Sequence, residues 1–149
     1  MDASGTPLTL DTAVAKAKDV ADRVLAPSAA ANDKAGRFSE DAVDALGKAR
    51  LLGLTMPVEH RGSGLGPRAF AAVVAALAEA DASVAMVYMM HVCAAATILA
   101  ARPAASVADT LGDIAAGRHL STLAFSETGS RSHFWGPSPR RAATGRASI

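Results

Sequence analysis

The sequence is short of cysteine and of surplus charge. Cys93 is its single cysteine, so no disulfide can form within the chain, and no neighbouring cysteine or histidine stands at metal-ligand spacing. Lys and Arg total 15 and Asp and Glu total 14, and they are spread along the chain without the basic stripe that binds nucleic acid. We therefore expect no metal site, no nucleic-acid partner and a reducing, cytoplasmic location.

A secretory signal and a convincing membrane span are also lacking. Residues 1–19 contain neither a basic region nor an unbroken apolar run. The uncharged segment Val84–Ala101 just reaches the length of a span, but Tyr88, His91 and Thr97 interrupt it, and no second such segment is present. A helix that is apolar all round is normally a core helix. We expect this segment to lie at the centre of a globular domain, with no membrane span.

What the chain does contain is helical periodicity. Apolar residues recur at the three-and-four spacing of amphipathic helices, and they make up 50% of the 149 residues, which is enough for one core. Ser39 is a good N-cap, Pro67 and Pro103 suit first helical positions, and Gly53 suits a left-handed C-terminal cap. The predicted fold is mainly α, a bundle of about five helices over residues 10–32 with a kink or break at Pro27, 40–52, 67–81, 84–101 and 103–117.

The character of the sequence changes at Leu120. Residues 120–125 have the β-branched and aromatic content of a strand, and the next five have a turn composition. A single strand leaves its backbone hydrogen-bonding groups unpaired and is not stable alone. We therefore expect an all-helical domain over residues 1–118, and over residues 119–149 the first strand of a β-domain that the sequence does not complete.

Two motifs suggest chemistry only weakly. The glycine-rich stretch 62–66 could cradle a phosphate with its backbone amides, but it follows a helix and a proline turn rather than a strand, which favours a tight connection between helices. Glu127, Ser132 and His133 are the residue types of a hydrolytic triad. Neighbouring side chains of an extended segment point apart, so Ser132 cannot easily reach a base at the next position.

Within the apolar segment, His91 has two interpretations. It is either a core histidine satisfied by a neighbouring group or a polar group that faces a ligand cavity. Tyr88 and Met89 share these alternatives. Cys93 is expected to be an inert core residue, because nothing near it in the sequence would lower its pKa.

The polar segment after Phe125 makes the stronger physical case for a ligand. Its hydroxyls and unhindered amides suit oxygen-rich, anionic groups, and Arg131 adds a cation that matches a phosphate. Phe125, Phe134 and Trp135 could supply flat apolar faces, which would suit a planar ring with a phosphate-bearing tail. A surface turn rich in small residues remains the alternative.

The order of segments along nearly the whole chain resembles the N-terminal half of the acyl-CoA dehydrogenases. The last segment is similar to the family's flavin-binding signature, commonly T-E-P-G-A-G-S-D. The resemblance implies a helical domain followed by a β-domain and a C-terminal four-helix bundle, FAD as cofactor, an acyl-CoA substrate and a homo-oligomeric full-length protein. The segments that carry it are LAPSAAANDKAGRF, LLGLTMPVEHRGSGLG, AEADASVAMVYMMH and LSTLAFSETGSRS.

The resemblance also implies roles for individual residues. Leu123, Phe125 and Ser126 fall where the family's strand lies along the flavin ring, and Ser132 falls at the flavin pyrophosphate and the acyl-CoA side of the pocket. The substrate contacts predicted are Ser132, Arg131, Met89 and His91. No catalytic residue is predicted, since the family's base is a glutamate of the C-terminal domain and Glu127 is only the glutamate of the signature. The isolated chain is therefore expected to be inactive.

Departures from the common signature leave the reaction open. Thr128 replaces proline, Arg131 replaces glycine and His133 replaces aspartate. A flavin-dependent monooxygenase of the same fold is the alternative within the family, because one fold can support several chemistries. A non-enzymatic helical interaction module is the alternative outside it. In either case apolar faces that other domains would cover should be exposed on this chain.

Overall fold

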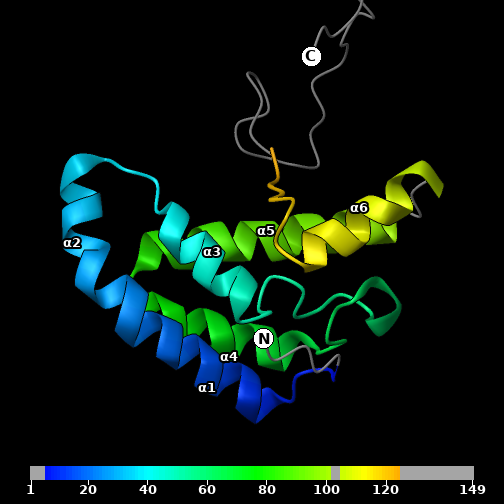
Figure 1. Ribbon diagram of the computed structural model, residues 1–149, viewed down its shortest axis with the longest axis horizontal. Helices are drawn as coiled ribbons and strands as arrows, with labels where there is room; N and C mark the ends of the chain where they lie inside the picture. The colour runs from blue at the N-terminus through cyan, green and yellow to red at the C-terminus, as the bar shows by residue number, and fades with distance from the viewer. Residues whose placement is uncertain (1–5, 102–104, 125–149) are drawn as a thin grey trace, which may run out of the picture.

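The computed structural model describes residues 6–101 and 105–124, and this part of the chain contains helices and no strand. A π-helical turn joins α1 to α2 without interruption, so the α-helices form five rods, as predicted (Figure 1). The elements are α1 (Leu10–Val20), η1 (Ala21–Leu25), α2 (Ala26–Ala35), α3 (Glu40–Lys48), η2 (Val58–His60), α4 (Pro67–Ala78), α5 (Ala82–Ala100) and α6 (Ala105–Ala115).

The first rod begins and ends on local signals in its sequence. Thr9 and Thr12 form a reciprocal capping box at the start of α1, and Gly36 ends α2 in the left-handed conformation, with φ of 58°. Pro27 cannot donate to the carbonyl of Arg23, and its ring would crowd that carbonyl in a regular α-helix. The wider π turn of η1 stands at this point, so the kink predicted at Pro27 is present and the helix does not break.

The end of α3 differs from the prediction. The helix stops at Lys48, and the left-handed residue that follows it is Arg50, with φ of 64°. Gly53, predicted as the left-handed cap, has another function. A Cβ at this position would lie 2.8 Å from the Ala115 carbonyl oxygen and 2.9 Å from its Cβ, so the glycine allows the chain to pass close to the end of α6.

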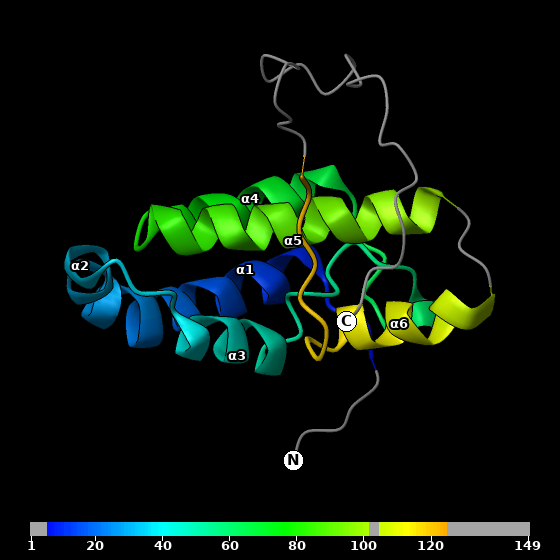
Figure 2. The ribbon, with the colours of Figure 1, turned by 90° about the horizontal axis from the view of Figure 1, so that it is seen from above.

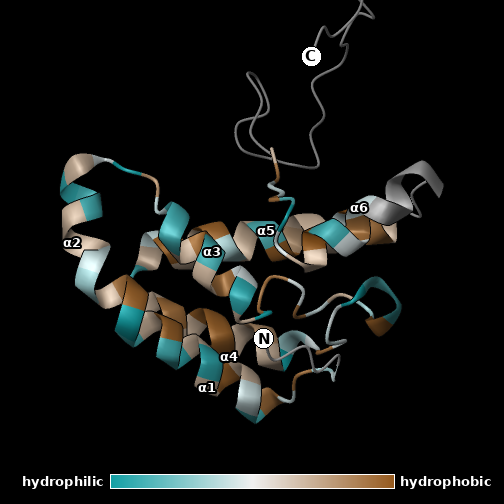
Figure 3. Ribbon diagram, viewed as in Figure 1, coloured by the Kyte–Doolittle hydropathy of each residue, from teal (hydrophilic) through white to brown (hydrophobic). Residues whose placement is uncertain are grey.

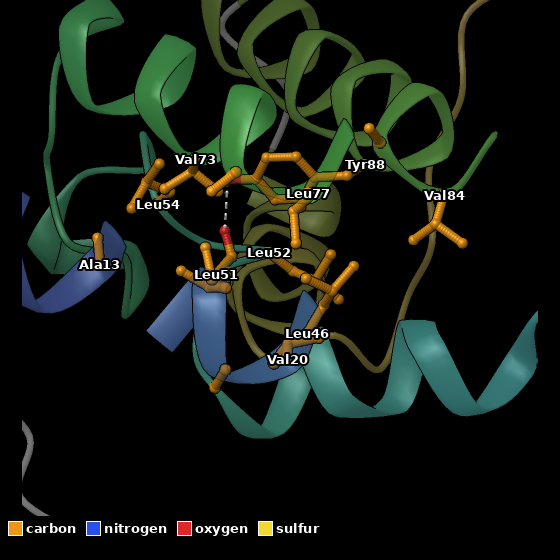
Figure 4. Packing of buried hydrophobic residues seen from close by; sticks show 14 of the residues in the cluster. Ala13, Val20, Leu46, Leu51, Leu52, Leu54, Val73, Leu77, Val84 and Tyr88 are labelled. Carbon is orange, nitrogen blue, oxygen red and sulfur yellow. Dashed lines mark hydrogen bonds between the residues drawn. The ribbon is translucent and has the colours of Figure 1, made fainter. Parts of the chain in front are cut away.

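The rods pack in two layers around one main core. In Figure 2, α4 and α5 form one layer, and α1, α3 and α6 lie beneath it. Figure 3 shows hydrophilic residues on α1 and apolar colouring over most of the visible surface of α4. Tyr88 is completely buried, and its hydroxyl donates to the Leu51 carbonyl over 3.1 Å (Figure 4). The residues buried with it include Leu25, Leu46, Leu51, Leu52, Leu54, Val73 and Leu77.

Helix α5 crosses the middle of this arrangement but is buried on one face only. Asp81 caps it by accepting from the amides of Ser83 and Val84. Its inner face packs against α4, α3 and α6, whereas Met86 on the outer face is 53% exposed. The helix therefore lies in the domain as predicted, but among the described residues only its inner face is buried. The reason is that the described rods cover one side of α5 and none of them packs on the other.

Helix α5 is also the one helix, within residues 6–101 and 105–124, that is long and apolar enough to cross a membrane. Composition alone does not decide between a span and a bundle helix. Its packing against three other helices favours the bundle helix that the sequence predicts.

The chain leaves the bundle after α6. Gly117 ends this helix in the left-handed conformation, with φ of 75°, as predicted. The strand expected from Leu120 is not formed over residues 120–124, which are irregular. A strand needs a neighbouring strand to pair its backbone groups, and the described residues supply none.

Candidate functional site

The glycine-rich stretch 62–66 is a connection between helices and not a phosphate cradle. Four successive backbone amides in it already donate to carbonyl groups of the same loop, so they are not free to bind an anion. A Cβ at Gly62 would lie 2.0 Å from the Met56 carbonyl oxygen, which explains the glycine by close packing. The four bonds run from Gly62 to Pro57, from Ser63 to Gly53, from Gly64 to Met56 and from Leu65 to Leu54.

The junction between the bundle and the exit segment is built around His91. This side chain is completely buried on the inner face of α5, and its Nδ1 accepts a hydrogen bond of 3.1 Å from the backbone amide of Ser121. The exit segment, residues 118–124, passes α5 at this point (Figure 2). Because Nδ1 is the acceptor, the proton of the neutral ring lies on Nε2.

Burial keeps this ring neutral. Removal from water is the main effect and lowers the pKa of His91 below its usual value of 6.5. The backbone carbonyls of Leu52 and Ile114 favour the protonated ring, and the nearby His119 disfavours it. The desolvation prevails, so His91 is uncharged at neutral pH and can act as the acceptor for Ser121.

Two polar atoms at this junction have no hydrogen-bond partner among the described residues. They are His91 Nε2 and Ser121 Oγ, and both are buried. The carbonyls of Leu52 and Ile114 do not meet the geometry of a hydrogen bond to Nε2. Unpaired polar atoms in a protein interior are costly, so they concentrate where something more specific than core packing is required.

The predicted substrate-binding residues Met89 and His91 are not brought together. They lie two positions apart on α5, and in an α-helix two positions correspond to a rotation of about 200°. His91 therefore faces the bundle, whereas Met89 is half-buried on the outer side near Met86 and Met90. Only Met89 lies where a ligand could reach it from outside the described bundle.

Of the predicted flavin contacts, Leu123 alone lies within the described residues. Its side chain is half-buried, and it stands two residues beyond the bond between Ser121 and His91. Phe125, Ser126, Arg131 and Ser132 lie outside the described residues, so their predicted roles remain predictions. Ser121, which anchors this segment, was not predicted, because nothing in the sequence connects it with a histidine thirty residues earlier.

A cavity of 340 Å³ lies elsewhere, between the end of α2, residues 36–39, α3 and the start of α5. Arg37 at its edge donates two hydrogen bonds to the side-chain carbonyl of Asn32 and is thereby held in place. None of the predicted cofactor or substrate residues lines this cavity. In the described part of the chain there is also no group of three or more His, Cys, Asp or Glu side chains that could hold a metal ion.

Comparison with known families agrees with this architecture. Residues 10–118, which run from the start of α1 to the turn after α6, match the family described as acyl-CoA dehydrogenase, N-terminal domain. No match was found among curated proteins. The matched region covers more than half of the chain, and the chain belongs to the acyl-CoA dehydrogenase family. The predicted family and helical fold are thus confirmed.

Proposed function

We propose that the chain is the helical domain and the start of the flavin-binding β-domain of an FAD-dependent, acyl-CoA dehydrogenase-like oxidoreductase. The reaction is the desaturation of an acyl-CoA thioester between its α and β carbons. The observation that carries the proposal is the family match over α1–α6, followed directly by the flavin-type segment that begins at Leu123. With it we propose a helical domain over residues 1–118, the β-domain start over residues 119–149, a cytoplasmic location and a homo-oligomeric full-length protein.

The described residues are compatible with FAD beside the exit segment. Leu123 is half-buried, belongs to no helix, and follows a residue that His91 holds in place. With Leu123, Phe125 and Ser126 would lie along the flavin ring, and Ser132 would meet the pyrophosphate. When bound, the flavin supplies the acceptor for the hydride that leaves the β carbon.

The substrate would lie on the outer side of α5. Met89 and its neighbours offer a flexible, apolar surface that suits an acyl chain. Arg131 and Ser132 carry a charge and a hydroxyl that suit the phosphates and polar groups of the coenzyme A part. His91 was predicted as a fourth substrate contact. Its buried position on the inner face of α5 supports another role, which is to hold the backbone of Ser121.

The isolated chain should not catalyse the reaction. Desaturation requires a base that removes the α proton, and no residue of this sequence matches the glutamate that supplies it in the family. Glu127 belongs to the flavin signature. The contribution of this chain is therefore to bind and to position, and the proton transfer depends on residues that this sequence does not contain.

A flavin-dependent monooxygenase is the second candidate. The observation in its favour is the altered signature, in which Thr128, Arg131 and His133 replace proline, glycine and aspartate. The two reactions differ in their products, because desaturation releases an enoyl thioester and leaves oxygen unused, whereas oxygenation consumes oxygen and adds one of its atoms to the substrate.

The isolated chain provides the first experiment. Purified 1–149 is mixed with FAD, an acyl-CoA series and an artificial electron acceptor, and is then passed through gel filtration. We expect no reduction of the acceptor and no stoichiometric flavin in the protein peak. Turnover, or a yellow equimolar complex after gel filtration, would show that the site is already complete in this chain and would overturn the proposed division of roles.

A further inference from the structure

We propose that the neutral ring of His91 is a positioning residue, which fixes the chain at Ser121 beside α5 and so determines where Leu123 lies. The inference rests on the proposed function for what the anchored segment does, namely to meet the flavin. The anchor itself is a statement about this chain alone and is tested without cofactor or substrate.

The geometry makes His91 the last anchor that the described residues show. The turn after α6 is held by backbone bonds from Arg118 and His119 to the Asp113 carbonyl, of 2.9 and 3.3 Å. Beyond His119, the next hydrogen bond is that from the Ser121 amide to His91 Nδ1. Two residues further on stands Leu123, so a displacement at Ser121 would pass directly to the predicted flavin contact.

The ring is itself held rigidly. His91 is completely buried between the inner face of α5, the turn that contains Leu52 and the end of α6 at Ile114, so its rotamer is fixed by packing. A backbone amide that is bonded to such a ring acquires a defined position relative to α5.

The anchor requires the uncharged ring. Protonation places a hydrogen on Nδ1, which then faces the Ser121 N–H as a second donor, and the bond is lost. The elements around His91 carry few titratable or charged groups. They are Tyr88 and Cys93 on α5, Arg50 in the turn after α3, which donates to the Thr6 carbonyl, Asp113 near the end of α6, which is paired with Arg118 after that helix, and His119, which opposes protonation. Asp113 is the one carboxylate among them, and Arg118 already neutralises it.

The test is amide hydrogen exchange at Ser121, measured by NMR on the 149-residue chain. His91→Leu removes the acceptor, His91→Asn places an amide group near the position of Nδ1, and His119→Asn is the matched control for a neighbouring histidine. We expect His91→Leu to accelerate exchange at Ser121 about tenfold at neutral pH. His91→Asn should keep most of the protection, and His119→Asn should leave it unchanged.

The pH profile separates positioning from packing. In the wild-type chain, protection of Ser121, corrected for the intrinsic rate of exchange, should persist at pH 6.5 and fall only at the lower pH at which the buried ring, whose pKa is lowered, takes up its proton. In His91→Asn it should not depend on pH in this range. If His91 served packing alone, the pH dependence of Ser121 protection would be the same in the wild type and in His91→Asn.

Several results would overturn the proposal. One is equal exchange at Ser121 in wild type and in folded His91→Leu, and another is protection that is independent of pH in the wild type. If His91→Leu does not fold, ring ¹⁵N shifts of the wild type decide, since a neutral ring that carries its proton on Nδ1 could not accept from Ser121. These outcomes leave the flavin and turnover experiments untouched, so the anchor and the proposed function can fail separately.

Discussion

At the scale of single residues, glycines in this chain serve close packing at two positions where turn rules predict other roles. Gly53 approaches Ala115, and Gly62 approaches the Met56 carbonyl. Neither has a positive φ, so a side chain is excluded by lack of space and not by backbone conformation. The sequence shows that a glycine is present, but the atom it approaches depends on a contact between segments that only the fold brings together.

Gly62→Ala should therefore be strongly destabilising. The added Cβ would overlap the Met56 backbone at 2.0 Å, and backbone atoms cannot rotate away as a side chain can. We expect a loss of about 3 kcal/mol in the free energy of unfolding, measured by urea denaturation. The control is Gly47→Ala within α3, where the nearest atom would be 3.7 Å away. It should be neutral or stabilising by up to about 1 kcal/mol. Equal effects of the two substitutions would refute this account of Gly62.

The burial of His91 predicts a pH dependence of stability. The pKa of His91 is lowered in the folded chain, so the unfolded chain binds more protons and stability rises with pH. The contribution of the neutral His91 ring to the free energy of unfolding is complete above about pH 6.5, the pKa of histidine in the unfolded chain. It is lost as the pH falls towards the lower pKa of the folded chain. Urea midpoints should therefore decrease on acidification in this range, and the decrease should be smaller in His91→Asn. If the urea midpoint of His91→Asn depends on pH as that of the wild type does, the dependence does not come from His91.

The residues of the candidate site were predictable only in part. The uncharged apolar segment Val84–Ala101 identifies His91 as a member of an apolar helix, and the structure places it on the inner face. Its partner Ser121 lies thirty residues away along the chain, and no local pattern joins them. Met89 and His91, which are close in the sequence, face opposite sides, because helical rotation separates positions two apart.

At the scale of elements, the helix starts were more predictable than the helix ends. Ser39 and Pro67 stand at the starts that the sequence indicates, and α5 begins at Ala82, two residues before the predicted start. The ends of α3 and α4, at Lys48 and Ala78, come earlier than the apolar pattern suggests. After α3 the chain turns so that Leu51, Leu52 and Leu54 enter the core, and this is a tertiary effect that overrides the continuing pattern.

Two of these caps provide a matched comparison. The Asp81 side chain accepts from two amides at the start of α5, whereas the Ser39 side chain makes no capping bond to α3. Asp81→Ala should lower the free energy of unfolding by about 1–2 kcal/mol. Ser39→Ala should change it by less than about 0.5 kcal/mol. Thermal or urea unfolding of both variants would check this, and a larger effect at Ser39 would show that the cap geometry described here is wrong.

At the scale of the whole molecule, the outer face of α5 is the feature that most needs explanation. On this apolar helix Met86 is 53% exposed, and Met89 and Met90 near it are only half-buried. The match is to an N-terminal domain of the acyl-CoA dehydrogenase family, and we propose that another domain of such a protein packs on this face. The family could be predicted from the order of segments. The extent of α5 that the other rods leave uncovered could not be predicted from the sequence.

The exposed face should be measurable in solution. We expect the isolated chain to bind the dye ANS and to self-associate as its concentration rises, because the described rods leave the outer face of α5 uncovered. Met86→Glu should reduce both effects. Val58→Glu is the control, since Val58 is 54% exposed but lies in η2, away from α5. If the two substitutions act equally, the association does not depend on the outer face of α5.

The most direct test of the central claim is a chimera. Residues 1–124 of this chain replace the corresponding part of an acyl-CoA dehydrogenase that retains its own flavin-binding strands and catalytic base. The measurement is the amount of bound flavin together with the rate of acyl-CoA desaturation. The account predicts that the folded chimera holds FAD and forms an enoyl-CoA, whereas the isolated chain does neither. A folded chimera without flavin or turnover would contradict the claim that this chain forms part of such a site.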